Sequence, residues 1–509
     1  MARSLELGSP VHQLFMNPFS RPLVVIDDPC EVADLLMRRG RDFDKSTAYG
    51  VWQTLVPAPP WPIRPTPTGR CSAPRGAFLR RVVGPHVYAA VLDLTRLWEA
   101  RIGEMSSKTV VPAMDVSKDF SFAALDAIWA SIFGERLDLV AGQAEAVGMG
   151  LPVPRFKGAM VAQTVDYVNI IWDQWGSSLW PGLSRWRITR SRAFRDYVAL
   201  KDRETGRLLS EAAARLQTLV PQEHEEAGRD ADDGGQDDSC LMDLVLRRSL
   251  LVAQKAGRTL PDPATNDDLK DELLLMIFAG HDTTSITLQW FVKYMTNNQE
   301  AQTKLRQALK HGFSKSTTND NSGDLPDCAA LLAADIPYLN AVMEETLRCA
   351  STASRGTRVA TVDTEILGRP IPKGTQVLLS LNVRWKPVPV PDDVRSPASR
   401  MAKAADWVLH PAAQDLDRFR PEHWLKVDEH GQELFDSEAL PRLSFSGGTR
   451  GTTPCHDGVA YYDLPDDYEV QVPPILEELN SPMAQERLLR APLQCYVKLQ
   501  TVASTNSKV

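Results

Sequence analysis

An acid and an alcohol stand side by side, at Asp282 and Thr283, directly after the most apolar stretch of the chain. That stretch, residues 273–279, reads LLLMIFA and has no polar face, which predicts a helical segment buried on all sides. Asp282 and Thr283 could deliver protons or hydrogen bonds, and Gly280 would let a flat or bulky group approach the backbone. The alternative is a kinked core helix whose threonine hydroxyls bond back to carbonyls.

The element that would position this pair is a long helix from Asp267 to Met295. Asn266 suits its start as a capping residue, and Asp268 suits the positive end of the helix dipole. At about 1.5 Å per residue such a helix extends roughly 43 Å, so we expect a central strut. Other clear helical patterns cover Leu92–Ile102, Ala193–Val220 and Ile336–Arg348. Short strand-like runs follow in the last 150 residues, such as Gln376–Leu381 and Cys495–Leu499.

A second set of chemically informative residues lies on the helix predicted for Ile336–Arg348. Glu345 and Arg348 are three residues apart, which places them on one helix face. Alone, such a pair is an ordinary surface contact worth about 0.2–0.5 kcal/mol. Two later segments give it context: residues 419–425 read FRPEHWL, and residues 445–451 read FSGGTRG, a loop whose three glycines permit a tight backbone.

Composition excludes several classes of protein. Among the 509 residues, 43% are hydrophobic and 24% are charged, which is close to the globular average and argues against a disordered or fibrous chain. Acidic residues outnumber basic ones, 65 to 57, so we expect no nucleic-acid partner. The seven cysteines form no CxxC pair, which favours a reducing compartment. We expect neither a signal peptide nor a membrane anchor, and an acidic surface loop over about residues 223–239.

Four motifs occur in one order and together resemble the cytochrome P-450 (haem-thiolate monooxygenase) family, particularly its fungal members. They are AGxDTT at Ala279–Thr284, ExxR at Glu345–Arg348, FxPExW at Phe419–Trp424 and FxxGxR at Phe445–Arg450. The resemblance runs from about Gly8 to about Leu499. It implies a mostly α fold with a minor β lobe, formed as a single large domain over residues 1–509.

The resemblance implies a role for each matched residue. Asp282 and Thr283 would pass protons to dioxygen bound at the haem iron, next to Gly280. Glu345 and Arg348 would form the structural pair beneath the haem, with His423 where the family usually has a third basic residue. The haem propionates would be bound by Arg358, Arg450 and the weaker candidate Arg80, since a planar guanidinium can hold a carboxylate with two hydrogen bonds.

The chain departs from the family pattern at the iron ligand. The pattern places a cysteine at position 452 and a glycine at 454, where this chain has Thr452 and Pro454. A threonine hydroxyl cannot replace a thiolate. Cys455 comes three residues late and could serve as the metal ligand if the loop re-forms, as could His456 beside it. The following residues, to about 475, are too rich in proline and aspartate for the long apolar helix that the family has here.

Two functional hypotheses follow. The first is a haem-dependent monooxygenase that inserts one oxygen atom from dioxygen into a small apolar organic substrate, in secondary metabolism or detoxification, with electrons from a reductase. The alternative is a catalytically inactive relative, or a mis-spliced gene product, that lacks the haem thiolate. The resemblance implies a location at the cytosolic face of the endoplasmic reticulum membrane. The sequence taken alone indicates no anchor and predicts a cytoplasmic protein.

Overall fold

The structure is a computed structural model of the chain. It describes residues 2–15, 22–45, 55, 76–105, 113–149, 158–176, 178, 180–219, 238–255, 257, 259, 261–314, 325–383, 388–401, 415–446, 468–471, 484–486, 490–492 and 495–501.

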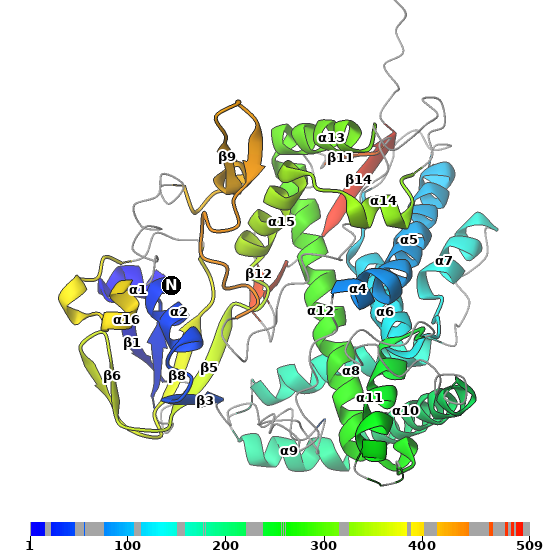
Figure 1. Cartoon of the computed structure of the whole chain (residues 1–509), viewed down its shortest axis with the longest axis horizontal. Coiled ribbons are helices and arrows are strands. Elements are labelled where there is room, and N and C mark those ends of the chain that lie inside the picture. The colour runs from blue at the N-terminus through cyan, green and yellow to red at the C-terminus, as the bar shows by residue number, and fades with distance from the viewer. Residues whose placement is uncertain are drawn as a thin grey trace, which may run out of the picture.

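A long central helix, α12 (Asp267–Asn297), organises the helical part of the molecule (Figure 1). The Asn266 side chain caps its start by accepting a hydrogen bond from the Leu269 N–H, as the sequence predicts. Helix α6 (Ser117–Phe133) packs along α12. The largest apolar cluster joins these two helices to α8 (Ala159–Gly176), α10 (Arg192–Leu219) and α11 (Leu241–Lys255).

The remaining helices of the described residues lie before and after α12 in the chain. Those before α12 are α1 (Ala2–Leu7), α2 (Pro29–Met37), α4 (Gly76–Phe78), the π-helical turn η2 (Leu79–Val83), α5 (Gly84–Met105), α7 (Leu139–Gly148), α9 (Pro181–Arg190) and the 3₁₀ turn η4 (Pro263–Thr265). Those after it are α13 (Gln299–Ser314), α14 (Cys328–Ala333), α15 (Pro337–Ala350), η5 (Asp392–Val394), α16 (Pro397–Met401) and η7 (Pro421–Trp424).

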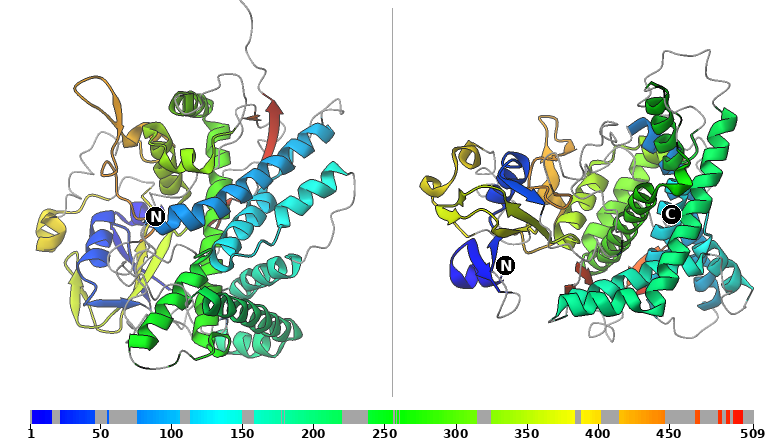
Figure 2. Two further views of the ribbon diagram at one scale, coloured as in Figure 1. Left: turned by 45° about the vertical axis from the view of Figure 1, so that its right-hand side comes forward. Right: turned by 90° about the horizontal axis from the view of Figure 1, so that it is seen from below.

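A five-stranded sheet forms a separate lobe beside the helices, visible in both views of Figure 2. Its strand order is β1-β2-β8-β5-β3, and all neighbours are antiparallel except the pair β2 and β8. The strands are β1 (Val11–Leu14), β2 (Leu23–Ile26), β3 (Phe43–Lys45), β5 (Arg355–Ala360) and β8 (Gln376–Ser380). One face packs its apolar residues against α2 in a core of its own.

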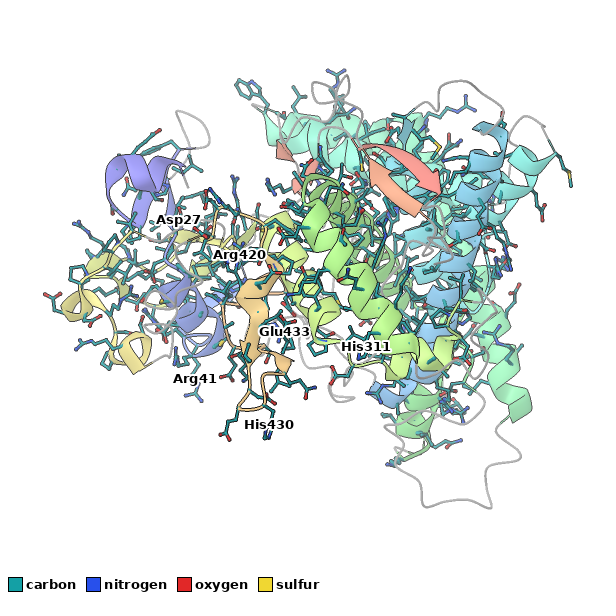
Figure 3. All side chains as sticks on the ribbon, turned by 90° about the horizontal axis from the view of Figure 1, so that it is seen from above. Asp27, Arg41, His311, Arg420, His430 and Glu433 are labelled. Atoms are coloured by element: carbon teal, nitrogen blue, oxygen red, sulfur yellow. The ribbon has the colours of Figure 1, made fainter. Side chains whose placement is uncertain are left out.

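Short strand pairs complete the described structure. They are β6 (Thr364–Ile366) with β7 (Arg369–Ile371), β9 (Leu425–Val427) with β10 (Glu433–Phe435), β12 (Ala484–Glu486) with β13 (Arg490–Pro492), and β14 (Tyr496–Thr501) between β4 (Met114–Asp115) and β11 (Tyr468–Gln471). From above, the segment that carries Arg420 and Glu433 lies between the sheet lobe and the helices (Figure 3).

The predicted fold class is confirmed: the chain is mostly helical, with a minor β lobe, in one large domain. All four predicted helices form, and so do the predicted strands, as β8 and β14. Within the described residues, no helix is both long enough and apolar enough to cross a bilayer. Residues 220–237 and 447–467 lie outside the described residues, and with them most of the predicted acidic loop and the altered ligand loop.

Candidate active site

One strip in the middle of α12 is exposed beside residues that are buried. Met276 is 36% exposed and Ala279 is exposed, while Ile277 and Phe278 between them are buried. Thr283 lies seven residues after Met276, so the three side chains share one helix face. The prediction that residues 273–279 are buried on all sides is therefore wrong. The residues Met276, Ala279 and Thr283 form an open strip on this face.

The predicted alcohol, Thr283, belongs to this open strip, and the predicted acid, Asp282, directly precedes it. The Thr283 hydroxyl donates a hydrogen bond to the Ala279 carbonyl oxygen at 2.6 Å. The Asp282 side chain is 16% exposed, and its Oδ1 lies 2.9 Å from Nδ1 of His281. The alternative of an ordinary core helix predicted such a hydrogen bond from a threonine hydroxyl to a backbone carbonyl. The bond is present, and α12 continues past Thr283 to Asn297. Thr283 and Asp282 remain accessible from the open strip.

Gly280 is explained by helix packing. A Cβ atom at Gly280 would lie 2.7 Å from Cδ1 of Ile128, a residue of α6. The missing side chain therefore allows α6 and α12 to approach each other. The prediction that Gly280 admits a flat group must be corrected, because Ile128 already fills that space.

A buried network surrounds the predicted pair on α15. Arg348 donates two hydrogen bonds to the Glu345 carboxylate, at 2.8 and 2.7 Å. His423 Nδ1 lies 3.2 Å from the same carboxylate, and Trp424 Nε1 donates to it at 3.0 Å. Arg348 also donates to three backbone carbonyl oxygens, those of Val383, Leu416 and Arg418. The structure thus brings together Glu345, Arg348 and His423, and joins α15 to η7 and the segment before it.

Charge and burial shift the pKa of the Glu345 carboxyl group in opposite directions. Burial alone would raise the pKa of its carboxyl group, but the charge and hydrogen bonds of Arg348 and the hydrogen bond from His423 lower that pKa to about 2. Glu345 and Arg348 are 0% and 3% exposed. A fully paired buried carboxylate of this kind serves to fix the chain segments around it, since removing one partner leaves a buried charge uncompensated.

Two of the three predicted propionate ligands, Arg358 and Arg80, lie among the described residues. Arg358 lies on β5, is half-buried, and donates a hydrogen bond from Nη1 to the Thr357 carbonyl oxygen at 2.9 Å. Arg80 is exposed on the π-helical turn η2, a type of distortion that often occurs at functional sites. Arg450 lies outside the described residues.

The described cysteines are poor candidates for an anionic iron ligand. Burial raises the pKa of the thiols of Cys30 and Cys495 to about 12 and that of Cys240 to about 11. Burial also raises the pKa of Cys328, and the Cys349 thiol lies 3.8 Å from a carboxylate oxygen of Glu345. No cluster of three histidine, cysteine or acidic side chains suited to a metal ion occurs among the described residues. Cys455 itself lies outside them.

Sequence reasoning missed two residues next to the acid. His281 is 2% exposed, and its Nε2 lies 2.9 Å from Oγ of Ser121 on α6. His281 stands within the recognised motif, so its position was a usable signal. Ser121 carries no signal of its own, because it lies 160 residues earlier and only the packing of α6 on α12 brings it here.

Comparisons with known proteins agree with this arrangement. The family model described as Cytochrome P450 matches residues 87–383. The cytochrome P450 monooxygenase TRI13 of Fusarium sporotrichioides is 29% identical, over 98% of this chain and 89% of that protein. The cytochrome P450 monooxygenase xilC of Penicillium crustosum is 30% identical, over 87% of this chain and 76% of that protein.

Solved structures show the same fold. A cytochrome P450DA haem domain superposes with a TM-score of 0.59 at 17% identity, covering 98% of this chain and 91% of that one. A structure of a zebra fish cytochrome P450 with progesterone has the same TM-score and identity, covering 98% of each chain.

The family match and these relatives show a haem-dependent monooxygenase, an oxidoreductase. The chain belongs to the cytochrome P450 family and is of the fungal type.

Proposed function

We propose that the chain binds haem against the open strip of α12 and uses Asp282 and Thr283 to supply the protons of oxygen insertion. The observation that carries this proposal is the apolar strip itself, in which Met276 and Ala279 are exposed beside Thr283. A flat, apolar macrocycle fits against small and apolar side chains, and the open strip provides them next to an acid and an alcohol. When bound, haem supplies the redox chemistry with dioxygen.

Protons come from the chain. Asp282, partly exposed, can exchange a proton at Oδ1, and the Thr283 hydroxyl can pass a proton or hold one by switching its hydrogen bond from the Ala279 carbonyl oxygen. With haem bound against it, the apolar strip would help to position an apolar organic substrate. A secondary-metabolic or detoxifying role agrees with the fungal monooxygenases that the chain resembles.

Four residues would hold the cofactor. The guanidinium groups of Arg358, Arg450 and, less directly, Arg80 suit the haem propionates. Cys455 would supply the thiolate, because it follows Arg450 in the loop where the family has its ligand, whereas Cys71, the other cysteine outside the described residues, lies far from that loop in the sequence. Glu345, Arg348 and His423 hold the neighbouring backbone segments in place.

A membrane surface fits helix α9, which supports the cytosolic face of the endoplasmic reticulum as the working location. Trp180, Leu183 and Trp186 are 73%, 57% and 53% exposed. Arg187 and Arg190 follow in the last turn, and the Arg190 guanidinium lies 4.7 Å from the ring centre of Trp186. Exposed tryptophan and leucine beside arginine suit the headgroup region of an anionic leaflet. An electron-donating reductase is then expected on the same membrane.

Haem titration of the purified chain tests the proposal. We expect saturation at one haem per chain, followed by the Soret absorbance. A chain that folds but takes up no haem would show that it is an inactive relative.

A further inference from the structure

One face of the five-stranded sheet packs against α2, and the other face carries a cavity. Side chains alternate between the two faces of a strand, so Val25 of β2 points away from its neighbours Val24 and Ile26, which belong to the core with α2. Val25 is half-buried and pairs across the sheet with Leu378 of β8. Both residues line a cavity of about 160 Å³. The cavity therefore lies on the face of the sheet opposite to α2.

The walls of this cavity are largely apolar. Leu14 of β1, Val25 and Leu378 line it, and each of them is half-buried. An apolar cavity of about 150 Å³ is large enough to hold a benzene ring. The cavity over β2 and β8 therefore has room for one aromatic ring or a short branched chain, and a group of that kind would remove apolar surface from water on binding.

A cation stands at the β5 edge of the cavity. Arg355 begins β5, is exposed, and pairs across the sheet with Ser380 of β8, which also lines the cavity. The Arg355 guanidinium makes no hydrogen bond or ion pair to any residue that the structure describes. Arg358, the predicted propionate ligand, lies three residues later, and an odd spacing along a strand places two side chains on opposite faces. Arg355 is therefore available to a ligand in the cavity, and Arg358 points away from it.

An acid at the opposite edge of the cavity is already engaged. The Oδ2 atom of Asp27, which follows β2, accepts a hydrogen bond from the Ser4 hydroxyl of α1 at 2.6 Å (Figure 3). That hydroxyl has one proton, so its 3.3 Å contact with Nδ1 of His12 requires Nδ1 to donate. Strand β8 separates β2 from β5, which places Asp27 about two strand spacings, roughly 10 Å, from the strand of Arg355. The charge of Asp27 therefore opposes an anion beside Arg355 only weakly.

We propose that this cavity binds a small carboxylic acid with an aromatic or branched apolar body, which goes beyond the proposed function. The apolar body lies against Val25 and Leu378. The carboxylate accepts two hydrogen bonds from the planar guanidinium of Arg355, and the Ser380 hydroxyl can donate a third. An inorganic anion lacks the apolar body, and a neutral ring leaves the guanidinium without a partner. The site uses none of the residues that would hold haem.

Titration of benzoate into the purified chain, followed by ligand-observed NMR, tests the site. We expect one saturable site in the unmutated chain. Arg355→Met keeps most of the side-chain length but removes the donors, so it should weaken benzoate binding about tenfold. Arg369→Met is the matched control and should leave the affinity unchanged, because Arg369 is another exposed arginine of the same lobe, on β7.

Two further comparisons separate the charge from the cavity. Benzamide has the shape of benzoate without its charge, so it should bind the unmutated chain about tenfold more weakly than benzoate does. It should bind Arg355→Met with the same affinity as it binds the unmutated chain. Ser380→Phe places a ring in the cavity and should abolish the binding of both compounds, with circular dichroism as the check of folding.

Equal benzoate affinities of the unmutated chain and Arg355→Met would overturn the site, and so would the absence of saturable binding. Benzoate binding that survives in folded Ser380→Phe would overturn it as well. If Ser380→Phe does not fold, the comparison of Arg355→Met with Arg369→Met decides. None of these measurements requires haem, so failure of the chain to bind haem would contradict the proposed function and leave this test in place.

Discussion

Gly280 of α12 lies directly against Ile128 of α6, so closely that a Cβ atom on Gly280 would be 2.7 Å from Ile128 Cδ1 and 2.8 Å from its Cγ1. This contact sets the spacing of the two helices beside the acid Asp282. It also places Ser121, about two turns before Ile128 along α6, against His281. The spacing of α6 and α12 beside Asp282 thus depends on a glycine that leaves room for Ile128.

Gly280→Val should therefore lower the free energy of unfolding by about 1–3 kcal/mol, because the added carbons overlap Ile128. Ile128→Ala in the same chain should recover part of that loss by vacating the space. Urea unfolding of both single variants and the double variant measures the coupling. Additive effects, with no recovery in the double variant, would show that the two side chains do not compete for one space.

The α15 network should respond to the loss of a single partner. Glu345→Leu leaves Arg348 buried without its carboxylate, and we expect a loss of about 3–5 kcal/mol or failure to fold. The exposed pair of Lys304 and Glu433, with 3.0 Å between Nζ and Oε1, provides the control, and Glu433→Leu should cost less than about 1 kcal/mol. Equal losses in the two variants would contradict the role given to burial.

Glu345 also predicts the acid stability of the chain. Its folded-state pKa of about 2 lies below the usual 4.5, so ionised Glu345 stabilises the fold above about pH 4.5. That contribution is lost as the pH falls from 4.5 towards 2. We expect the unfolding midpoint in urea to drop across this interval. In Glu345→Gln, if it folds, the drop should be smaller; an identical pH dependence would assign the acid sensitivity to other carboxyl groups.

Arg490 holds a C-terminal strand to the core. Its Nη1 donates to the carbonyl oxygens of Ala350 at 2.7 Å and Cys349 at 3.2 Å, at the end of α15, and its guanidinium lies 4.5 Å from the Trp290 ring centre. Arg490→Met should cost about 2–4 kcal/mol, because two buried carbonyl groups lose a charged donor. The stability of Arg490→Lys should lie between that of the unmutated chain and that of Arg490→Met. Differential scanning calorimetry ranks the three proteins by their unfolding temperatures. An unfolding temperature of Arg490→Met equal to that of the unmutated chain would show that Arg490 does not stabilise the fold.

Helix α9 should bind anionic bilayers. Sedimentation with vesicles of phosphatidylcholine containing phosphatidylserine should retain the chain, and salt should weaken the retention by screening the arginines. Trp180→Ser combined with Trp186→Ser should release it. Met149→Ser, which removes another side chain that is 70% exposed, should change nothing. Retention of the double tryptophan variant equal to that of the unmutated chain would exclude α9 as the contact.

Local sequence patterns predicted the elements of this fold well. The apolar spacing and the Asn266 cap fixed the start of α12 at Asp267, and the motif residues Glu345 and Arg348 are indeed one face of one helix. These features depend on neighbours three or four residues apart, which a sequence displays directly.

Contacts between segments distant in the chain could not be predicted from the sequence. Leu273–Ala279 reads as uniformly apolar, so nothing in it marks Met276 and Ala279 as the open strip. Gly280 has the same local signature whether a flat ligand or Ile128 fills the space. The pairing of Ser121 with His281 depends on how α6 lies on α12, and only the folded chain shows it.

The axial iron ligand tests the central claim most directly. The haem-loaded chain is reduced, exposed to carbon monoxide, and its Soret spectrum is compared with those of Cys455→Ala and Cys328→Ala. Cys328 is a matched control, because it is a half-buried cysteine on α14. We expect the red-shifted Soret band of thiolate ligation in the unmutated chain and in Cys328→Ala, and its loss in Cys455→Ala. A spectrum without that band in the unmutated chain, or one unchanged by Cys455→Ala, would contradict the account.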